Sequence, residues 1–197
     1  MNHELAPAQE VLDFWFLPAG HPEHGTSRAE WWKKSDAFDA TIRTRFGATA
    51  VAALADGMCE WDALGPRGTL ARIVVLDQFT RNGWRGTPAS FAGDALALQA
   101  AIALVDSGAH LALNSMERWF AYMPFEHAED MAMQERAVAL FTALVEVEPS
   151  LDGALDYARR HLEVIARFGR FPHRNTILGR LSTPDEAIYL AQPGAGF

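Results

Sequence analysis

Residues 91–108, FAGDALALQAAIALVDSG, decide the fold class that the sequence predicts. Alanine and leucine are strong helix formers and recur throughout this stretch, which favours a helix over a strand. The pair Thr87 and Pro88 before it is a helix start signal, because proline at a first helical position loses no hydrogen bond. Gly108 after it is a C-terminal signal. We therefore expect one helix from Pro88 to Ser107.

Helix signals recur along the chain, whereas strand signals do not. Caps, prolines and apolar residues at helical spacing predict further helices that start near Pro7, Ser35, Thr69, Asn114, His127, Ser150 and Thr183. The last of these should open with a capping box formed by Thr183 and Glu186. The run LARIVVL at 70–76 is the one strand candidate, and its length fits either element. Pro124 should end the helix that contains MERWFAYM, since the residue before a proline avoids the helical conformation. The following helix should run from about His127 to Glu146.

These signals amount to about eight or nine helices joined by short loops, which implies antiparallel neighbours and an all-α fold. Successive pairs suit an array of helical hairpins, and the array must be irregular because the residues show no repeat of fixed period. No linker or low-complexity stretch divides the sequence. We therefore expect a single all-helical domain over residues 1–197.

The composition argues against several classes of function. A formal net charge of -8 disfavours a nucleic-acid binder, because such a protein needs a basic face. The apolar runs are too short to span a bilayer and residues 1–9 hold no secretion signal, so we expect a cytoplasmic protein that does not bind membranes. Cys59 is the single cysteine, which excludes an internal disulfide and a cysteine-based zinc cluster.

The stretch Arg167–Arg180, RFGRFPHRNTILGR, concentrates four arginines and a histidine in this acidic chain. Gly169 should end one helix and Pro172 should begin another, which places HRN at 173–175 in a first helical turn. Free backbone N–H groups and the positive end of the helix dipole gather in such a turn, so it is a candidate anion-binding corner. In the alternative interpretation, these arginines pair with the acids of FEHAED at 125–130 and with Asp77 in a buried network that fixes the packing.

Several polar residues occupy positions where helical spacing predicts apolar ones. Asp77 shares a helix face with an apolar group, and Arg81, four residues later, can pair with it. His127 opens a stripe that continues through Gln134 and Phe141. His161 lies on the inward face of the next helix. One inward histidine is usually a hydrogen-bonded core residue, but two on consecutive helices followed by PHRN favour a shared site.

Five motifs together resemble one known family. They are FWF at 14–16, LDQFTRN at 76–82, RGTPASFAGD at 85–94, PFEHAED at 124–130, and RFGRFPHRN with LGRLST near the C-terminus. This combination is similar to the bacterial domain-of-unknown-function 924 family over nearly the whole chain. The resemblance implies an all-helical fold related to tetratricopeptide repeats and no assigned biochemical activity.

The resemblance also implies a set of recurrent polar positions. In this sequence they are Asp77, Gln78, Arg81, Asn82, Arg85, Glu126, His127, Glu129, Asp130, His161, Arg167, Arg170, His173, Arg174 and Asn175. The chain departs from the family pattern at Thr80, where a proline is common, and at Ala128, where a serine is common. The missing hydroxyl argues against a serine nucleophile at position 128.

Acid–base chemistry is the reaction type that these residues suit best. Histidine as a residue type changes protonation near neutral pH, and a neighbouring carboxylate orients it for proton transfer. We expect His161 and Glu126 to transfer protons, with Asp77 orienting a partner. The expected ligand-binding residues are Arg81, His127, Arg167, Arg170, His173, Arg174 and Asn175. The sequence has no GxSxG elbow and no P-loop, which disfavours a usual serine hydrolase and a nucleoside triphosphatase.

The sequence therefore predicts a protein that binds a small anionic molecule and acts on it by hydrolytic or other acid–base chemistry. It predicts no cofactor. A loose divalent-metal site formed by Asp77, Glu126, His127, His161 and His173 is an alternative, although the chain lacks the Glu-x-x-His motif. The second class of function is a helical scaffold that binds a protein partner and in which the arginine motif only pins helices together.

Overall fold

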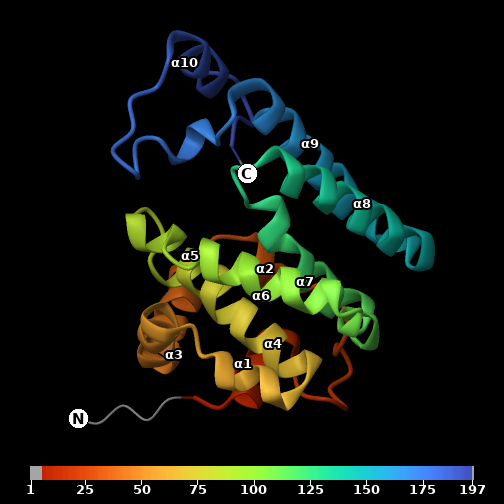
Figure 1. The fold of residues 1–197 in the computed structure, drawn as a ribbon. Helices are drawn as coiled ribbons and strands as arrows, with labels where there is room; N and C mark the ends of the chain where they lie inside the picture. Colours follow the sequence, from red (N-terminus) through yellow and green to blue (C-terminus); the bar gives the residue numbers. More distant parts are fainter. Residues whose placement is uncertain (1–5, 197) are drawn as a thin grey trace. The chain divides into compact units, whose positions relative to one another are not determined.

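The computed structural model describes residues 6–196, and these residues form helices and no strand (Figure 1). They contain ten α-helices, of which α2 (Ala29–Trp32) and α5 (Thr80–Gly83) have only four residues each. The all-α prediction is confirmed. Within the described residues the chain forms two compact units, unit 1 with residues 6–85 and 89–124 and unit 2 with residues 86–88 and 125–196.

Unit 1 contains the helices from α1 to α7, except for the last two residues of α7, Phe125 and Glu126, which belong to unit 2. The longer elements are α1 (Ala8–Phe16), α3 (Asp36–Asp56), α4 (Pro66–Ile73), α6 (Asp94–Asp106) and α7 (Ser115–Glu126). The short ones are η1 (Cys59–Leu64), the π-helical η2 (Val74–Phe79), η3 (Pro88–Phe91) and η4 (Ala109–Ala112). Aromatic rings fill its core: the fully buried Trp15 lies 5.7 Å from Phe79 and 5.5 Å from Phe120 between ring centroids.

The strand candidate LARIVVL is helical and runs from α4 into η2. All side chains from Leu70 to Thr80 are buried, so this continuous apolar run marks a helix that is covered on every side. The prediction that Thr69 caps the helix is wrong. The helix begins at Pro66 after Gly65, whose φ is 81°, and the Thr69 hydroxyl donates to the Asp62 carboxylate at 2.8 Å.

The helix expected from Pro88 to Ser107 is two elements, η3 and α6, separated by a turn. In this turn the chain passes close to η2 at Gly93, where a Cβ would lie 2.0 Å from the carbonyl oxygen of Leu76. The chain can pass this close to η2 only at a glycine. Gly108, with φ at 74°, follows α6 as predicted.

The boundary between α7 and α8 (Met131–Val147) also differs from the prediction. Helix α7 continues through Pro124 and ends at Glu126. Helix α8 begins only at Met131, because the Asp130 carboxylate accepts a hydrogen bond from the Met133 amide and caps it. His127 therefore lies in the connection between two helices and not on α8. Gln134 and Phe141 of the predicted inward stripe are fully buried.

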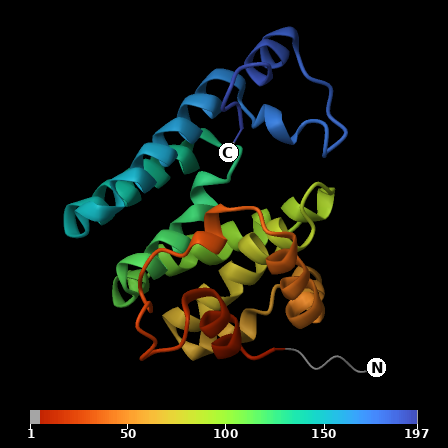
Figure 2. The ribbon, with the colours of Figure 1, turned by 180° about the vertical axis from the view of Figure 1, so that it is seen from behind.

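Unit 2 is built on the hairpin of α8 and α9 (Asp152–Phe168), which lie side by side along their length (Figures 1 and 2). The 3-10 turn η5 (Pro149–Leu151) joins them. Gly169, with φ at 68°, ends α9 as predicted. The chain then forms the single 3-10 turn η6 (Pro172–Arg174) and the short helix α10 (Pro184–Leu190), which starts with the predicted capping box of Thr183 and Glu186.

Residues 88–106, 19 residues in all, are long and apolar enough to cross a membrane by length and composition alone, with a mean hydropathy of 1.4 in an 18-residue window. This is a weak indication, because the core helix of a soluble protein passes the same test. Helix α6, which forms most of the stretch, packs against α4 and η2 within unit 1.

We expect Gly93→Ala to lower the free energy of unfolding by about 2–3 kcal/mol, because the new Cβ would overlap the Leu76 carbonyl oxygen. The φ of Gly93 is -89°, which alanine adopts readily, so the contact alone sets the cost. The control is Gly47→Ala inside α3, where an added Cβ meets no atom within 4 Å. It should raise stability by roughly 0.5–1 kcal/mol. Urea unfolding followed by tryptophan fluorescence measures both, and equal stabilities would contradict the prediction.

Candidate functional site

Two of the predicted site residues, Asp77 and Arg81, lie in unit 1 and pair with each other there. Arg81 Nη1 donates to Asp77 Oδ1 at 2.6 Å, as the spacing of four residues predicts, and Asp94 lies 2.8 Å from the same nitrogen. Gln78 Nε2 donates to the other oxygen of Asp77 at 2.6 Å. Asp77 is thus fully buried in an ionic network on the π-helical segment.

The remaining predicted residues belong to unit 2, where Glu126 and His161 form a buried pair. Glu126 is the last residue of α7, and His161 is in the third turn of α9. Their side chains are 5% and 6% exposed, and Glu126 Oε1 lies 2.9 Å from His161 Nδ1. The Tyr157 carbonyl oxygen is also 2.9 Å from Nδ1. Since both neighbours are acceptors, the proton of the neutral imidazole belongs on Nδ1.

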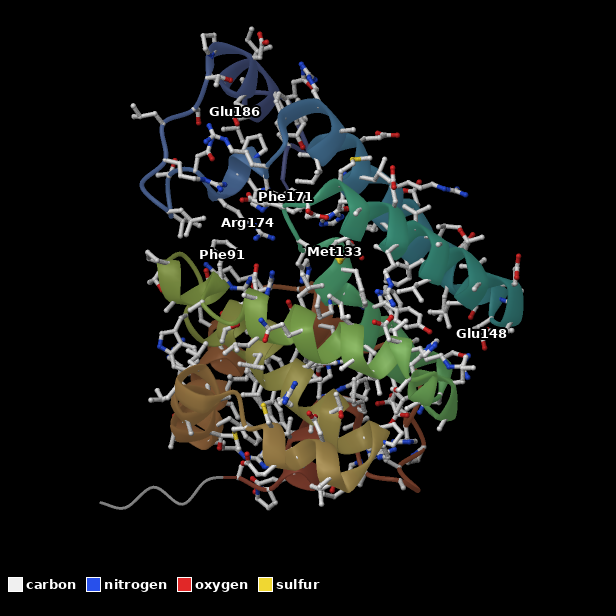
Figure 3. The ribbon with its side chains drawn as sticks, viewed as in Figure 1. Phe91, Met133, Glu148, Phe171, Arg174 and Glu186 are labelled. Atoms are coloured by element: carbon white, nitrogen blue, oxygen red, sulfur yellow. The ribbon has the colours of Figure 1, made fainter. Side chains whose placement is uncertain are left out.

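Two further histidines lie around this pair. The rings of His127 and His161 are 6.2 Å apart, and Phe171 separates His161 from His173 with centroid distances of 5.4 Å and 5.7 Å. Arg174 donates to the His127 carbonyl oxygen at 2.9 Å, and its guanidinium carbon lies 4.7 Å from the Phe171 ring centroid. Phe171 and Arg174 come from the segment after α9 (Figure 3). We call Glu126, His127, His161, His173 and Arg174 the histidine cluster.

His173 is neutral at physiological pH. Burial of its ring, and then electrostatic interaction with Arg174, His161 and His127, lower its pKa from 6.5 to about 4, although the charge of Glu129 works in the opposite direction. A neutral imidazole can accept or donate a hydrogen bond but contributes no charge. His173 therefore suits a polar contact with a ligand better than an electrostatic one.

The arginine motif is tied into unit 2 by carboxylates. Arg170 donates to both oxygens of Glu186 at 2.7 and 2.8 Å, and Arg180 donates to both oxygens of Glu129 at 2.9 and 2.6 Å. Such two-pronged pairs fix the position of both side chains. Hydrogen bonds from Arg170 lower the pKa of Glu186 to about 2, so this carboxylate stays ionised.

Asn175 and Arg167 take different positions. Asn175 is fully buried, and its amide donates to Ser182 and Glu186 while its oxygen accepts from Arg180. It therefore holds the loop that precedes α10. Arg167 is exposed on α9, and its guanidinium carbon lies 4.6 Å from the ring centroid of Phe168.

The anion-binding corner expected at Pro172 has no helix behind it. The chain makes one 3-10 turn, and the amides of Arg174 and Asn175 donate to the carbonyl oxygens of Phe171 and Pro172. The Phe171 amide donates to Glu129 at 2.8 Å. These N–H groups are used within the chain, and a turn of three residues has no appreciable dipole.

A shallow cavity of about 210 Å³ lies elsewhere in unit 2. Its lining comes from α9, from Tyr189 of α10 and from the tail after it, and consists of Arg160, Glu163, Val164, Tyr189, Gln192, Pro193, Gly194 and Ala195. The tail also reaches the histidine cluster, because Gly196 packs on His173 so closely that an added Cβ would lie 3.3 Å from the His173 Cβ.

The described residues contain no group of three or more histidine, cysteine or acidic side chains arranged to hold a metal ion. The loose metal site considered from the sequence would have to combine Asp77 of unit 1 with residues of unit 2.

Sequence reasoning missed some of the partners that hold the site. Glu129 is one of the acids that the alternative interpretation pairs with the arginines, and Arg180 does bind it, whereas Glu186 was visible only as a capping residue and was not assigned to an arginine. Gln134 was visible as a polar residue on an otherwise apolar stripe, which is the signal that could have found it. Its side chain is fully buried against the end of α7.

Comparison with known proteins gives two matches. The model of a family described as bacterial protein of unknown function (DUF924) matches residues 11–194. The solved structure of a protein of unknown function from Agrobacterium tumefaciens is 37% identical in sequence and has a TM-score of 0.80, covering 94% of this chain and 97% of that chain. No curated protein matches the sequence. The matches agree on an all-helical bacterial family.

The lowered pKa of His173 predicts an acid-sensitive stability. Between pH 6.5 and 4 the unfolded chain binds a proton at this residue and the folded chain does not, so stability falls as pH falls. From pH 7 to pH 5 the loss should be about 2 kcal/mol. Urea unfolding at both pH values measures the fall in the free energy of unfolding between pH 7 and pH 5. In His173→Gln this fall should be smaller than in the wild type by about 2 kcal/mol. His21→Gln, which changes an exposed loop histidine, should keep the wild-type loss. Equal losses in all three proteins would contradict the assignment.

Proposed function

We propose that this chain, which belongs to the DUF924 family of bacterial proteins of unknown function, binds a small anionic molecule at the histidine cluster and hydrolyses it by acid–base chemistry. The observation that carries the proposal is the buried contact of 2.9 Å between Glu126 Oε1 and His161 Nδ1. Burying two ionisable groups costs free energy because both lose their hydration. Such pairs are typical of places where they fix the packing or take part in chemistry.

The tautomer of His161 supports a role as general base. With the proton on Nδ1, held by Glu126 and the Tyr157 carbonyl, the lone pair of the neutral ring is on Nε2. In the proposed reaction Nε2 takes a proton from water, and the water oxygen bonds to the electrophilic atom of the substrate. The bond to the leaving group breaks, and the imidazolium returns the proton to it. Glu126 stabilises the imidazolium in between.

The groups around the pair support an anionic ligand. Arg174 brings a guanidinium beside the three histidines, close enough for its charge to lower the pKa of His173. A guanidinium matches the geometry of phosphate and carboxylate oxygens. Arg170, one of the ligand-binding residues expected from the sequence, donates to Glu186 and Leu181, so we restrict the proposed ligand contact to Arg174, His127 and His173 of the expected set.

A second candidate function is a protein-binding scaffold. It is favoured by two bulky apolar side chains near the arginine motif, Leu181 and Ile188, which are 91% and 61% exposed. Exposed apolar residues on an ordered segment are typical of interaction sites. In this case the pairs of Arg170 with Glu186 and Arg180 with Glu129 would have a structural role only.

Binding is tested with inorganic phosphate as the probe. Phosphate should shift the ring NMR resonances of His127, His161 and His173 in the wild type. Arg174→Gln removes one charge-assisted partner and should weaken binding about tenfold or more. Arg159→Gln, which removes an exposed arginine of α9, is the matched control and should bind as the wild type does. Ring resonances that do not respond to phosphate in the wild type would favour the scaffold.

Catalysis is tested with p-nitrophenyl phosphate. His161→Asn removes the base and should reduce kcat/KM by about 100-fold or more, and Glu126→Gln should reduce it about tenfold. His21→Asn should leave the rate unchanged, because the residue lies in an exposed loop far along the chain from the cluster. If the wild type binds phosphate but releases no p-nitrophenol, the anion site stands and the hydrolytic part of the proposal fails.

A further inference from the structure

The side chain of Gln134 contacts the end of the helix that carries Glu126. Gln134 lies in the first turn of α8 and is fully buried. Its Nε2 lies 2.7 Å from the Glu126 carbonyl oxygen, 2.7 Å from that of Ala128 and 3.3 Å from that of Phe125. Three carbonyl oxygens of the segment 125–128 therefore converge on one amide nitrogen.

This arrangement supplements the backbone bonding at the C-terminus of α7, where the Ala128 amide donates to the Phe125 carbonyl oxygen at 3.3 Å. The last carbonyl groups of a helix have no partner within the helix and must find donors elsewhere. No glycine is present at this end, whereas α9 ends on Gly169. The two hydrogens of the Gln134 amide are shared among the three oxygens instead. Gln134 thus fixes where α7 stops and which way the chain leaves it.

The backbone that Gln134 holds is the backbone of the buried pair. Its bond to the Glu126 carbonyl fixes the residue whose carboxylate lies 2.9 Å from His161 Nδ1. We call the hydrogen bonds from Gln134 to the carbonyl oxygens of residues 125–128 the clamp. Through the Glu126 carboxylate the clamp connects three elements, with Gln134 on α8, Glu126 at the end of α7 and His161 on α9. A shift of this short segment would move the carboxylate directly, because only one side chain lies between backbone and imidazole.

The amide orientation follows from the same contacts. If the amide were reversed, its oxygen would face three carbonyl oxygens, so the nitrogen must occupy this position. The other atom, Oε1, is buried and has no hydrogen-bond partner among residues 6–196. A buried acceptor of this kind costs about 1–3 kcal/mol, which offsets much of what the donor bonds contribute to stability. This cost argues that the clamp serves geometry more than stability.

We propose that Gln134 is a positioning residue, which clamps residues 125–128 and thereby holds the Glu126 carboxylate against His161 so that the imidazole keeps its proton on Nδ1. Any effect of Gln134 on catalysis rests on the proposed function. Its effect on the position of Glu126 does not, because the tautomer of His161 can be measured without a substrate.

The first experiment tests the clamp in the wild type. The Gln134 side-chain amide protons should exchange with solvent at least about tenfold more slowly than those of Gln99, an exposed glutamine of α6. They should also show through-bond NMR couplings across the hydrogen bonds to the Glu126 and Ala128 carbonyl groups. Exchange as fast as that of Gln99 would overturn the proposal without any variant.

The second experiment follows the ring nitrogens of His161 by NMR. Gln134→Met keeps the length of the side chain but has no donor, and Gln134→Asn keeps the amide but is one methylene too short. In both variants the His161 nitrogen shifts should change from those of the Nδ1–H tautomer to those of a mixture. Gln99→Met should leave them as in the wild type. A folded Gln134→Met or Gln134→Asn that retains the wild-type shifts would overturn the proposal.

The outcomes separate this inference from the proposed function. If the wild type neither binds phosphate nor releases p-nitrophenol, but the His161 tautomer depends on Gln134, then the clamp stands and the hydrolase does not. If the wild type is active and the tautomer does not depend on Gln134, the hydrolase stands and the clamp fails. If both hold, kcat should fall in Gln134→Met together with the loss of the tautomer, while Gln99→Met remains active.

Discussion

Four hydrogen bonds converge on the carboxylate of Glu186, and the order of unit 2 after α9 depends on them. Two come from Arg170, one from the Asn175 amide and one from the Thr183 backbone amide. The same carboxylate therefore closes a helix capping box and anchors both ends of the loop between Arg170 and Thr183. Because this loop has no regular secondary structure beyond one 3-10 turn, side-chain bonds replace the backbone ladder that would otherwise fix it.

The loop in turn places the aromatic and basic residues of the histidine cluster. Arg180 pairs with Glu129 and also donates to the carbonyl oxygen of Phe171, whose amide donates to Glu129. Phe171 is thus fixed on both sides, and its ring separates His161 from His173. An acidic chain concentrates arginines here because two of them neutralise carboxylates from outside the motif. Positive charge in the sequence is therefore not a direct measure of positive charge available to a ligand.

Local signals in the sequence predicted much of this fold. Ser35, Gly169 and the capping box at Thr183 start or end helices through contacts with residues that are near in sequence. Their roles could therefore be inferred without a structure. The errors lie where tertiary contacts are made. At Gly93 the chain passes the backbone of Leu76, 17 residues away by the numbering, in a contact that local signals do not reveal. Helix α7 passes Pro124, and the carbonyl groups beyond this proline accept hydrogen bonds from Gln134 of the next helix.

The candidate site was harder to predict than the fold for the same reason. The pairing of Asp77 with Arg81 is local and could be predicted from spacing, whereas Arg170 finds its carboxylate 16 residues away and Arg180 finds its own 51 residues away. Helical periodicity identified His161 as inward but contains no information on which acid it meets. The sequence therefore indicated the residue types of the candidate site but not the long-range pairs that they form.

The exposed side chain of Leu181 stands on a loop whose backbone is ordered by hydrogen bonds. Arg170 donates to its carbonyl oxygen, Asn175 holds the next residue, Ser182, and Thr183 begins the capping box. The backbone on which this leucine stands is already ordered before anything touches it. A partner that covered it would lose little backbone entropy from this segment on binding, since most of the ordering cost is met when unit 2 folds.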